Sequence, residues 1–217
     1  MARPEPKFEP QSTVMIVDDD EETRDSLSSL LRSVGLDVKV LASVPEFLTH
    51  ERPRGPTCLV LDVRLPGRSG LEFQRELSVA NVQIPIIFIT GHADVPMSVQ
   101  AMKGGAIEFL TKPVREQDLL DAVQLGLARD RERIESEKAL SELRERFETL
   151  SPREREVMLR VVKGRLNKQI AGDIGVSEVT VKVHRGQVMR KMKASSLPEL
   201  ARIADKLRLM TEAPQTR

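Results

Sequence analysis

The chain has 217 residues, enough for one medium-sized domain or two small domains with separate cores. Its 40% hydrophobic and 31% charged residues are typical of a soluble protein, and its 3% aromatic residues, with no Trp or Tyr, argue against a surface that stacks bases or sugars. The single cysteine, Cys58, excludes a disulfide framework and a multi-cysteine metal site, and its apolar neighbours predict a buried side chain.

Charge divides the chain into two parts of opposite sign. Residues 1–150 carry 19 lysines and arginines against 26 aspartates and glutamates, whereas residues 151–217 carry 15 against 7. These net charges of −7 and +8 almost cancel in the whole chain, which carries +1. A basic C-terminal third on an acidic body predicts a module that binds a polyanion.

The N-terminal segment, residues 1–12, is rich in proline and charge and is expected to be disordered. It lacks the apolar core of a signal peptide, and no run in the chain approaches the ~18–20 apolar residues that span a membrane. We therefore expect a cytoplasmic protein with no membrane partner.

Residues 13–128 alternate between short apolar runs and segments with helical spacing. The runs expected to form strands are Val14–Val17, Val38–Leu41, Leu59–Leu61, Ile86–Ile89 and Ile107–Leu110. Strands that are apolar throughout and separated by helices predict an α/β fold, a doubly wound (βα)5 domain with a parallel sheet covered on both faces. Two serine–glutamate pairs, Ser43 with Glu46 and Ser69 with Glu72, have the spacing of capping boxes.

A helical linker is expected over residues 129–150. The run from about Gln117 onward contains no proline and is dense in Arg, Glu, Leu and Ala. Within it, four apolar residues repeat with a 3-4-3 spacing: Leu140, Leu143, Phe147 and Leu150. Two interpretations stay open, a solvated helix held by salt bridges or a short coiled coil that joins two domains.

Residues 151–210 predict an all-α domain of four short helices, followed by a flexible tail at residues 211–217. Its helix boundaries are marked by Ser151–Glu154, Ser177, Ser196 and the closing Gly175. Two helices joined by a tight turn, the second of them basic, indicate a helix-turn-helix.

Polar residues directly follow the predicted strands. They are Asp18, Asp19 and Asp20 after the first, Asp62 after the third, Thr90 after the fourth and Lys112 after the fifth. Because the carboxyl ends of parallel strands meet at one crevice, these side chains should converge. Carboxylates held together need a cation or a proton to offset their charge, and a few hard oxygen ligands suit Mg²⁺, with Mn²⁺ as a substitute.

The set suits phosphoryl transfer to a carboxylate, with Asp62 as nucleophile and Thr90 and Lys112 binding the phosphoryl oxygens. An aspartate-dependent phosphatase shares this nucleophile, but it needs an acid two residues later, where this chain has Arg64. We therefore expect no enzyme activity beyond Mg²⁺-dependent phosphorylation and dephosphorylation of the chain itself. A regulator that works without phosphorylation remains the alternative, which the complete acidic and sensing set disfavours.

The motifs IVDDDE, LVLDVRLPGRSG, FITGH and FLTKP resemble those of a bacterial response-regulator receiver domain. The segment LSPREREVMLRVVKGRLNKQIAGDIGVSEVTVKVHRGQVMRKMKASSLPEL resembles a LuxR-type helix-turn-helix. Together they resemble the NarL/FixJ family of two-domain transcription factors, most of all the FixJ branch, over nearly the whole chain. Residues 13–128 are then the receiver domain and residues 151–210 the DNA-binding domain.

This resemblance implies that Asp62 is the phosphoacceptor and carries the 4-aspartylphosphate. It also implies that Asp19 and Asp62 bind the metal directly, that Asp18 acts mostly through water, and that the backbone carbonyl of Arg64 is the third protein ligand. Arg64 and His92 lie two residues after Asp62 and Thr90, and we expect them to border the route of the hydrolytic water.

In the same family Thr90 and Lys112 sense the phosphoryl group, Phe109 is the switch aromatic, and the Lys112–Pro113 bond is cis. Attraction of the Thr90 hydroxyl to the phosphoryl group vacates space that Phe109 can fill by rotating. The surface expected to change and to dimerise comprises Val95–Lys103, Ala106–Leu110 and Arg115–Leu125.

The predicted second helix of the helix-turn-helix carries the DNA-binding residues. Val179, Val183 and Val188 are expected to face the core of the domain. The resemblance implies that Lys182 and Val183 reach base edges, while the position of the third base reader is occupied by Gly186, which has no side chain to offer. The full set expected at the DNA is Lys168, Gln169, Thr180, Lys182, Val183, His184, Arg185, Arg190 and Lys191.

Together the two domains imply a phosphorylation-activated transcriptional regulator of a two-component system. Its expected partners are a sensor histidine kinase, double-stranded promoter DNA, RNA polymerase and, after phosphorylation, a second copy of the chain. The resemblance to this family also implies that the protein acts as an activator.

Overall fold

The computed structural model describes residues 12–92 and 94–209. They form two compact units that divide between Ile134 and Glu135. The segments expected to be disordered, 1–12 and 211–217, lie outside the described residues except for Ser12, which is buried. In the described ranges, no helix combines the length and the apolar character that crossing a membrane requires.

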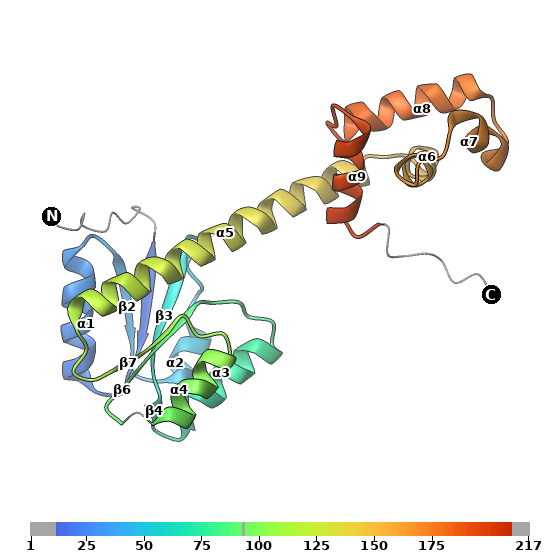
Figure 1. Ribbon diagram of the computed structural model, residues 1–217. Helices are drawn as coiled ribbons and strands as arrows, with labels where there is room; N and C mark the ends of the chain where they lie inside the picture. The colour runs from blue at the N-terminus through green and yellow to red at the C-terminus, as the bar shows by residue number, and fades with distance from the viewer. Residues whose placement is uncertain (1–11, 93, 210–217) are drawn as a thin grey trace, which may run out of the picture. The chain divides into compact units, whose positions relative to one another are not determined.

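The first unit contains a five-stranded parallel sheet in the order β2-β1-β3-β6-β7 (Figure 1). Its strands are β1 (Thr13–Val17), β2 (Asp37–Leu41), β3 (Thr57–Asp62), β6 (Ile86–Thr90) and β7 (Glu108–Thr111). Every residue of β1, β3 and β6 is buried, as expected for strands that are apolar on both faces. The chain order of the strands reverses between β1 and β3, which places a ligand crevice at their carboxyl ends.

Helices cover both faces of this sheet and confirm the doubly wound (βα)5 fold. One face packs against α1 (Glu21–Ser33) and the first turns of α5 (Glu116–Glu148). The other packs against α2 (Val44–Thr49), α3 (Gly70–Val79) and α4 (Val95–Lys103).

Side chains at the helix starts follow the predicted pattern with one difference. Ser69 and Glu72 form the expected capping box at α3. At α2 the Ser43 hydroxyl accepts the Glu46 N–H, but the Glu46 carboxylate accepts its hydrogen bond from the N–H of Ala42 instead of Ser43. Residues 64–69, which break away from β3, form a two-stranded antiparallel hairpin of β4 (Arg64–Leu65) and β5 (Arg68–Ser69).

The second unit is all-α and has its own core. Its helices are the end of α5, α6 (Pro152–Val162), α7 (Asn167–Ile174), α8 (Glu178–Lys191) and α9 (Leu197–Lys206). Gly175 closes α7 in the left-handed conformation and turns the chain into α8. Leu150 belongs to the core of this unit, and Leu143 and Phe147 pack against it. Leu150 is buried, whereas Leu143 and Phe147 are half-buried, so the 3-4-3 seam packs at least in part within its own domain.

The packed side of α8 differs from the prediction. Val179 and Val183 are 74% and 57% exposed, whereas Val181, Val188 and Met192 are buried. Spacings of seven and four residues keep the buried three on one side of the helix. A two-residue step turns about 200°, so Val179 and Val183 point away from that side. Of the three valines expected in the core, only Val188 lies on the buried side.

Candidate functional site

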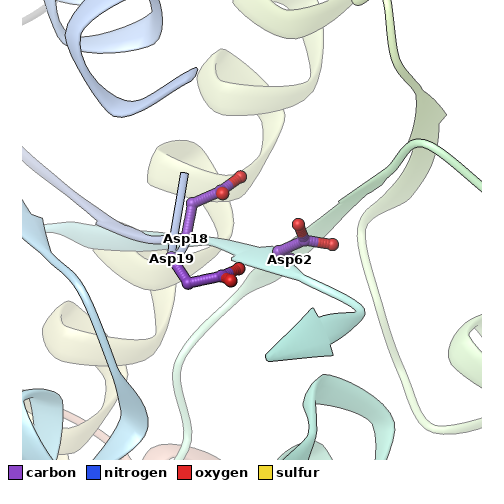
Figure 2. Close-up of side chains that lie close together, drawn as sticks. All are labelled: Asp18, Asp19 and Asp62. Carbon is purple, nitrogen blue, oxygen red and sulfur yellow. The ribbon is translucent and has the colours of Figure 1, made fainter. Parts of the chain in front are cut away.

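Three carboxylates meet at the carboxyl ends of the two central strands. Asp18 and Asp19 follow β1 and Asp62 ends β3, so the parallel register brings them together (Figure 2). One oxygen from each lies within 4.8 Å of the others. Asp18 and Asp62 are buried, and Asp19 is exposed. Asp20, the fourth acid of this set, instead caps α1 by accepting the N–H of Thr23 at 3.1 Å.

Lys112 bridges two of these carboxylates from the end of β7. Its Nζ donates to Asp18 Oδ2 at 2.7 Å and to Asp62 Oδ2 at 3.0 Å. Burial raises the pKa of Asp18, and the hydrogen bond from Lys112 offsets this only in part. Burial alone would lower the pKa of Lys112, but the hydrogen bonds and charges of Asp18 and Asp62 together raise it. The ammonium therefore stays charged beside the carboxylates.

The backbone around Asp62 is fixed by its neighbours. Asp62 Oδ1 accepts the N–H of Arg64 at 3.0 Å, while the Arg64 side chain is exposed. On the other side, a Cβ on Gly70 would lie 2.3 Å from the Asp62 carbonyl oxygen. Gly70 is thus a residue of the site that the sequence reading missed, since LPGRSG indicated only a turn and a helix start. A glycine at a helix start beside a reactive strand end was the available signal for this close approach.

The remaining receiver residues lie on the two strands beyond Asp62. Thr90 is fully buried at the end of β6, and its hydroxyl is 3.3 Å from both the N–H and the carbonyl oxygen of His92. Phe109 on β7 is partly buried, with its ring centroid 6.3 Å from that of Phe88. The Lys112–Pro113 bond is cis, as expected.

The donor set fits a small hard cation. Carboxylate oxygens are the ligands that Mg²⁺ prefers, and its ligand distance of about 2.1 Å places octahedral ligands roughly 3 to 4 Å apart. One oxygen from each of Asp18, Asp19 and Asp62 lies within 4.8 Å of the others, so all three can face one cation. Water molecules would complete the coordination shell of such an ion.

A second group of predicted residues lies on α7 and α8. Lys168, Gln169, Lys182, Val183 and Arg190 are exposed. The half-buried members are Thr180, His184, Arg185 and Lys191. These nine residues share one unit, separate from the acidic site.

Two of the expected DNA-binding cations make contacts inside the domain. Arg185 Nη1 donates to Asn167 Oδ1 at 2.9 Å and links α8 to the start of α7. Lys191 belongs to the set expected at the DNA, but its Nζ is turned into the domain, where it lies 2.6 Å from Glu154 Oε2 and 3.0 Å from the Thr149 carbonyl oxygen. Glu154 is buried, and the sequence reading assigned it only a capping role.

Comparison with known proteins assigns both units. The response regulator receiver domain family matches residues 14–124, and the luxR family of bacterial regulatory proteins matches residues 148–204. The chain belongs to the NarL/FixJ family of response regulators. The regulator is 53% identical over 197 residues to nodulation protein W of Bradyrhizobium diazoefficiens, which covers 91% of this chain and 87% of that protein. It is 47% identical over 191 residues to the transcriptional regulatory protein FixJ of Azorhizobium caulinodans, covering 88% and 90%.

Solved structures agree with this assignment. The regulator resembles the response regulator StyR with a TM-score of 0.81 and 47% identity, covering 90% of this chain and 99% of that one. It resembles full-length FixJ from B. japonicum with a TM-score of 0.53 and 36% identity, covering 91% and 97%. The expected receiver fold, LuxR-type DNA-binding domain and role as a transcriptional regulator are confirmed.

Proposed function

We propose that this regulator accepts a phosphoryl group on Asp62 from a sensor histidine kinase, dimerises and binds promoter DNA as an activator. The observation that carries the proposal is the convergence of three carboxylates and the Lys112 ammonium at the carboxyl ends of the strands. A charged lysine between two buried acids can bind a phosphoryl oxygen, and a neighbouring carboxylate can accept the group, as phosphoryl transfer to a carboxylate requires.

The reaction forms one bond and breaks one. An Asp62 carboxylate oxygen attacks the phosphorus of a phosphohistidine, the P–N bond breaks, and the imidazole leaves with the bonding electron pair. Bound Mg²⁺ or Mn²⁺, held by Asp19, Asp62 and the Arg64 carbonyl with Asp18 acting through water, would offset the charge that develops on the transferred oxygens. Lys112 is already within hydrogen-bond distance of Asp62 and would bind a phosphoryl oxygen after transfer.

The new dianion then competes for the Thr90 hydroxyl. Among the described residues, that hydroxyl contacts only the His92 backbone, and at the long distance of 3.3 Å, so a charge-assisted hydrogen bond can replace these contacts. Movement of Thr90 opens space toward Phe109 on the adjacent strand, as proposed for the switch. Support for a dimer surface on α4, β7 and α5 comes from exposed apolar side chains at Val95, Val99, Met102 and Leu125.

The DNA-binding half of the proposal rests on α8. Thr180, Lys182 and Val183 lie in its N-terminal half, where a recognition helix contacts base edges. Lys168, Gln169, His184, Arg185 and Arg190 flank them and would contact phosphates. Gly186 is exposed with open space around it, so packing does not require a glycine there. Bases near Gly186 would therefore be read less strictly than those near Lys182.

Further parts of the proposal follow from this role. A DNA-binding regulator works in the cytoplasm, and an activator contacts RNA polymerase. Beyond its own phosphorylation and dephosphorylation we expect no enzymatic activity. Arg64 and His92 would set the phosphoryl lifetime, and an unchanged dephosphorylation rate in both Arg64→Ala and His92→Ala would remove that assignment.

The test is sedimentation of the full chain with Mg²⁺, with and without beryllofluoride as the phosphoryl mimic. The wild type should shift from monomer to dimer, and Asp62→Asn should not shift. Asp20→Asn is the matched control, because Asp20 adjoins the metal-binding acids but caps α1, and asparagine caps equally well. A wild type that stays monomeric would overturn the dimer, and an Asp62→Asn chain that still dimerises would overturn the phosphoacceptor.

A further inference from the structure

Three carbonyl groups at the end of α5 and just beyond it are bound by two cationic side chains from other helices. Arg155 of α6 donates from Nη2 to the Glu148 carbonyl oxygen at 3.0 Å and from Nε to that of Leu150 at 3.1 Å. Lys191 of α8 donates to the carbonyl oxygen between them, that of Thr149. Such carbonyls lack partners within their own helix and carry the negative end of its dipole. Cations are therefore the side chains that fit this helix end best.

Lys191 also joins this helix end to α6. Its Nζ lies 2.6 Å from Glu154 Oε2, the same oxygen that accepts the N–H of Ser151 at 2.7 Å. The Glu154 side chain is 7% exposed and that of Lys191 29% exposed. One ammonium thus links three segments of the DNA-binding unit: the end of α5, the start of α6 and the C-terminal half of α8.

The position of Lys191 on α8 agrees with an internal role. Its neighbour Met192 belongs to the buried side of the helix with Val181 and Val188. Arg190, one step earlier, is exposed and bonded only to Gln187 of its own helix among the described contacts. Arg190 therefore has the geometry of a phosphate contact, and Lys191 does not.

We propose that Lys191 is a positioning residue for DNA recognition, which fixes the direction of α8 by holding it to Thr149 and Glu154 and does not neutralise a DNA phosphate. The proposal rests on the DNA-binding function. Lys191 is eleven and nine residues from the expected readers Thr180 and Lys182, so it acts on them through the rigid helix. A small change of direction at its C-terminal end moves the N-terminal half across the groove.

The experiment compares two affinities of the full chain, activated with Mg²⁺ and beryllofluoride. One duplex is selected from a random pool by the wild type, the other is an unselected duplex of equal length, and both are measured at several salt concentrations. In Lys191→Met we expect affinity for the selected duplex to fall about tenfold, similar to one mismatched base pair, with affinity for the unselected duplex unchanged. The slope of log K against log salt should also stay unchanged.

Arg190→Met is the matched control on the same helix. Loss of a phosphate contact should lower both affinities together and reduce the slope by about 0.9. The same pattern in Lys191→Met would overturn the proposal.

Further variants of Lys191 and of its ion-pair partner Glu154 separate a positioning role from a general effect on stability. The Glu154 side chain is buried and cannot reach DNA, yet Glu154→Gln should reduce selectivity without changing the salt slope. The double variant Lys191→Met/Glu154→Gln should be no less selective than Lys191→Met alone. Lys191→Arg should be more selective than Lys191→Met and close to the wild type, because it keeps the positive charge. If circular dichroism shows a folded Lys191→Met chain with wild-type selectivity, Lys191 is only a structural contact and the proposal fails. A wild type that retains no duplex would instead overturn the DNA-binding function itself.

Discussion

Gly70 brings the start of α3 against the strand that carries the phosphoacceptor. A Cβ there would lie 2.3 Å from the Asp62 carbonyl oxygen and 3.2 Å from Val63 Cα, both backbone atoms that cannot move aside cheaply. We expect Gly70→Ala to destabilise the receiver by about 1–3 kcal/mol, the usual cost of overpacking, and to weaken Mg²⁺ binding. Thermal unfolding and Mg²⁺ titration measure the two effects.

Gly91→Ala is the control for this substitution. Gly91 lies in the loop after Thr90, does not have a positive φ, and would meet nothing within 4 Å of an added Cβ. It should leave the unfolding temperature and Mg²⁺ affinity near those of the wild type. Equal effects of the two variants would show that loop stiffness, and not contact with Asp62, limits the site.

The ionised carboxylate of Glu154 should make the stability of the DNA-binding unit depend on pH. The hydrogen bond from Lys191 holds the pKa of its carboxyl below the ordinary value of 4.5, and the Ser151 backbone adds to this against the effect of burial. A lowered pKa in the folded state means that the stabilisation is present above pH 4.5 and is lost as the pH falls through the folded-state pKa. In Glu154→Gln the free energy of unfolding should therefore fall less steeply below pH 4.5.

Urea unfolding of the wild type and Glu154→Gln at a series of pH values measures this difference. Glu156→Gln is the control on the same helix, because the Glu156 carboxylate pairs with Arg153 and Arg160 nearer the surface. It should keep the steep decrease of the wild type. Parallel profiles for all three proteins would contradict the assignment.

At the scale of elements, α5 lies against β3 because Gly126 has no side chain. A Cβ at Gly126 would lie 2.6 Å from Cys58 Sγ and 3.5 Å from the Pro85 side chain. Alanine stabilises a helix interior by about 1 kcal/mol relative to glycine. Here the steric overlap with Cys58 should outweigh this gain, so Gly126→Ala should lower the free energy of unfolding by about 1–3 kcal/mol. In a Cys58→Ala background, the same substitution should become neutral or stabilising, since the sulfur is gone.

A double-mutant cycle in urea unfolding measures this coupling. The Cys58 thiol is fully buried, and burial raises its pKa, so it contributes as a small apolar side chain and not as a reactive group. Additive effects of Gly126→Ala and Cys58→Ala would show that the helix does not approach β3 as closely as the structure indicates.

The same elements show which parts of the fold the sequence could predict. The strands β1, β3 and β6 could be predicted from the sequence, because burial on both faces makes nearly every residue in them apolar. The position of the site could then be predicted from the polar residues at the ends of these strands. Side-chain direction on α8 was harder, because valines stand on both sides of that helix and only tertiary packing selects Val181 and Val188. The contact between Lys191 and Thr149 joins residues 42 positions apart, and no local pattern encodes it.

At the scale of the whole molecule, the chain combines two units with separate cores. The receiver has apolar clusters on both faces of its sheet, and the DNA-binding unit has its own cluster, which includes Leu150. Only the receiver holds the acidic site, so a ligand bound there stabilises the receiver by mass action and leaves the other unit unaffected. Calorimetry of the full chain should therefore resolve two unfolding transitions, of which Mg²⁺ with beryllofluoride raises only one.

Two variants assign these transitions. Gly70→Ala should lower the transition that responds to the ligand, and Glu154→Gln should lower the other. At a free ligand concentration one hundred times the Kd, the receiver gains about 2.7 kcal/mol, which at its size corresponds to a shift of roughly 10 °C. A single transition that moves as a whole with ligand and with both variants would show that the units unfold together. In that case α5 would transmit stability across the division at residue 134, and the two halves of the regulator could not be treated as independent.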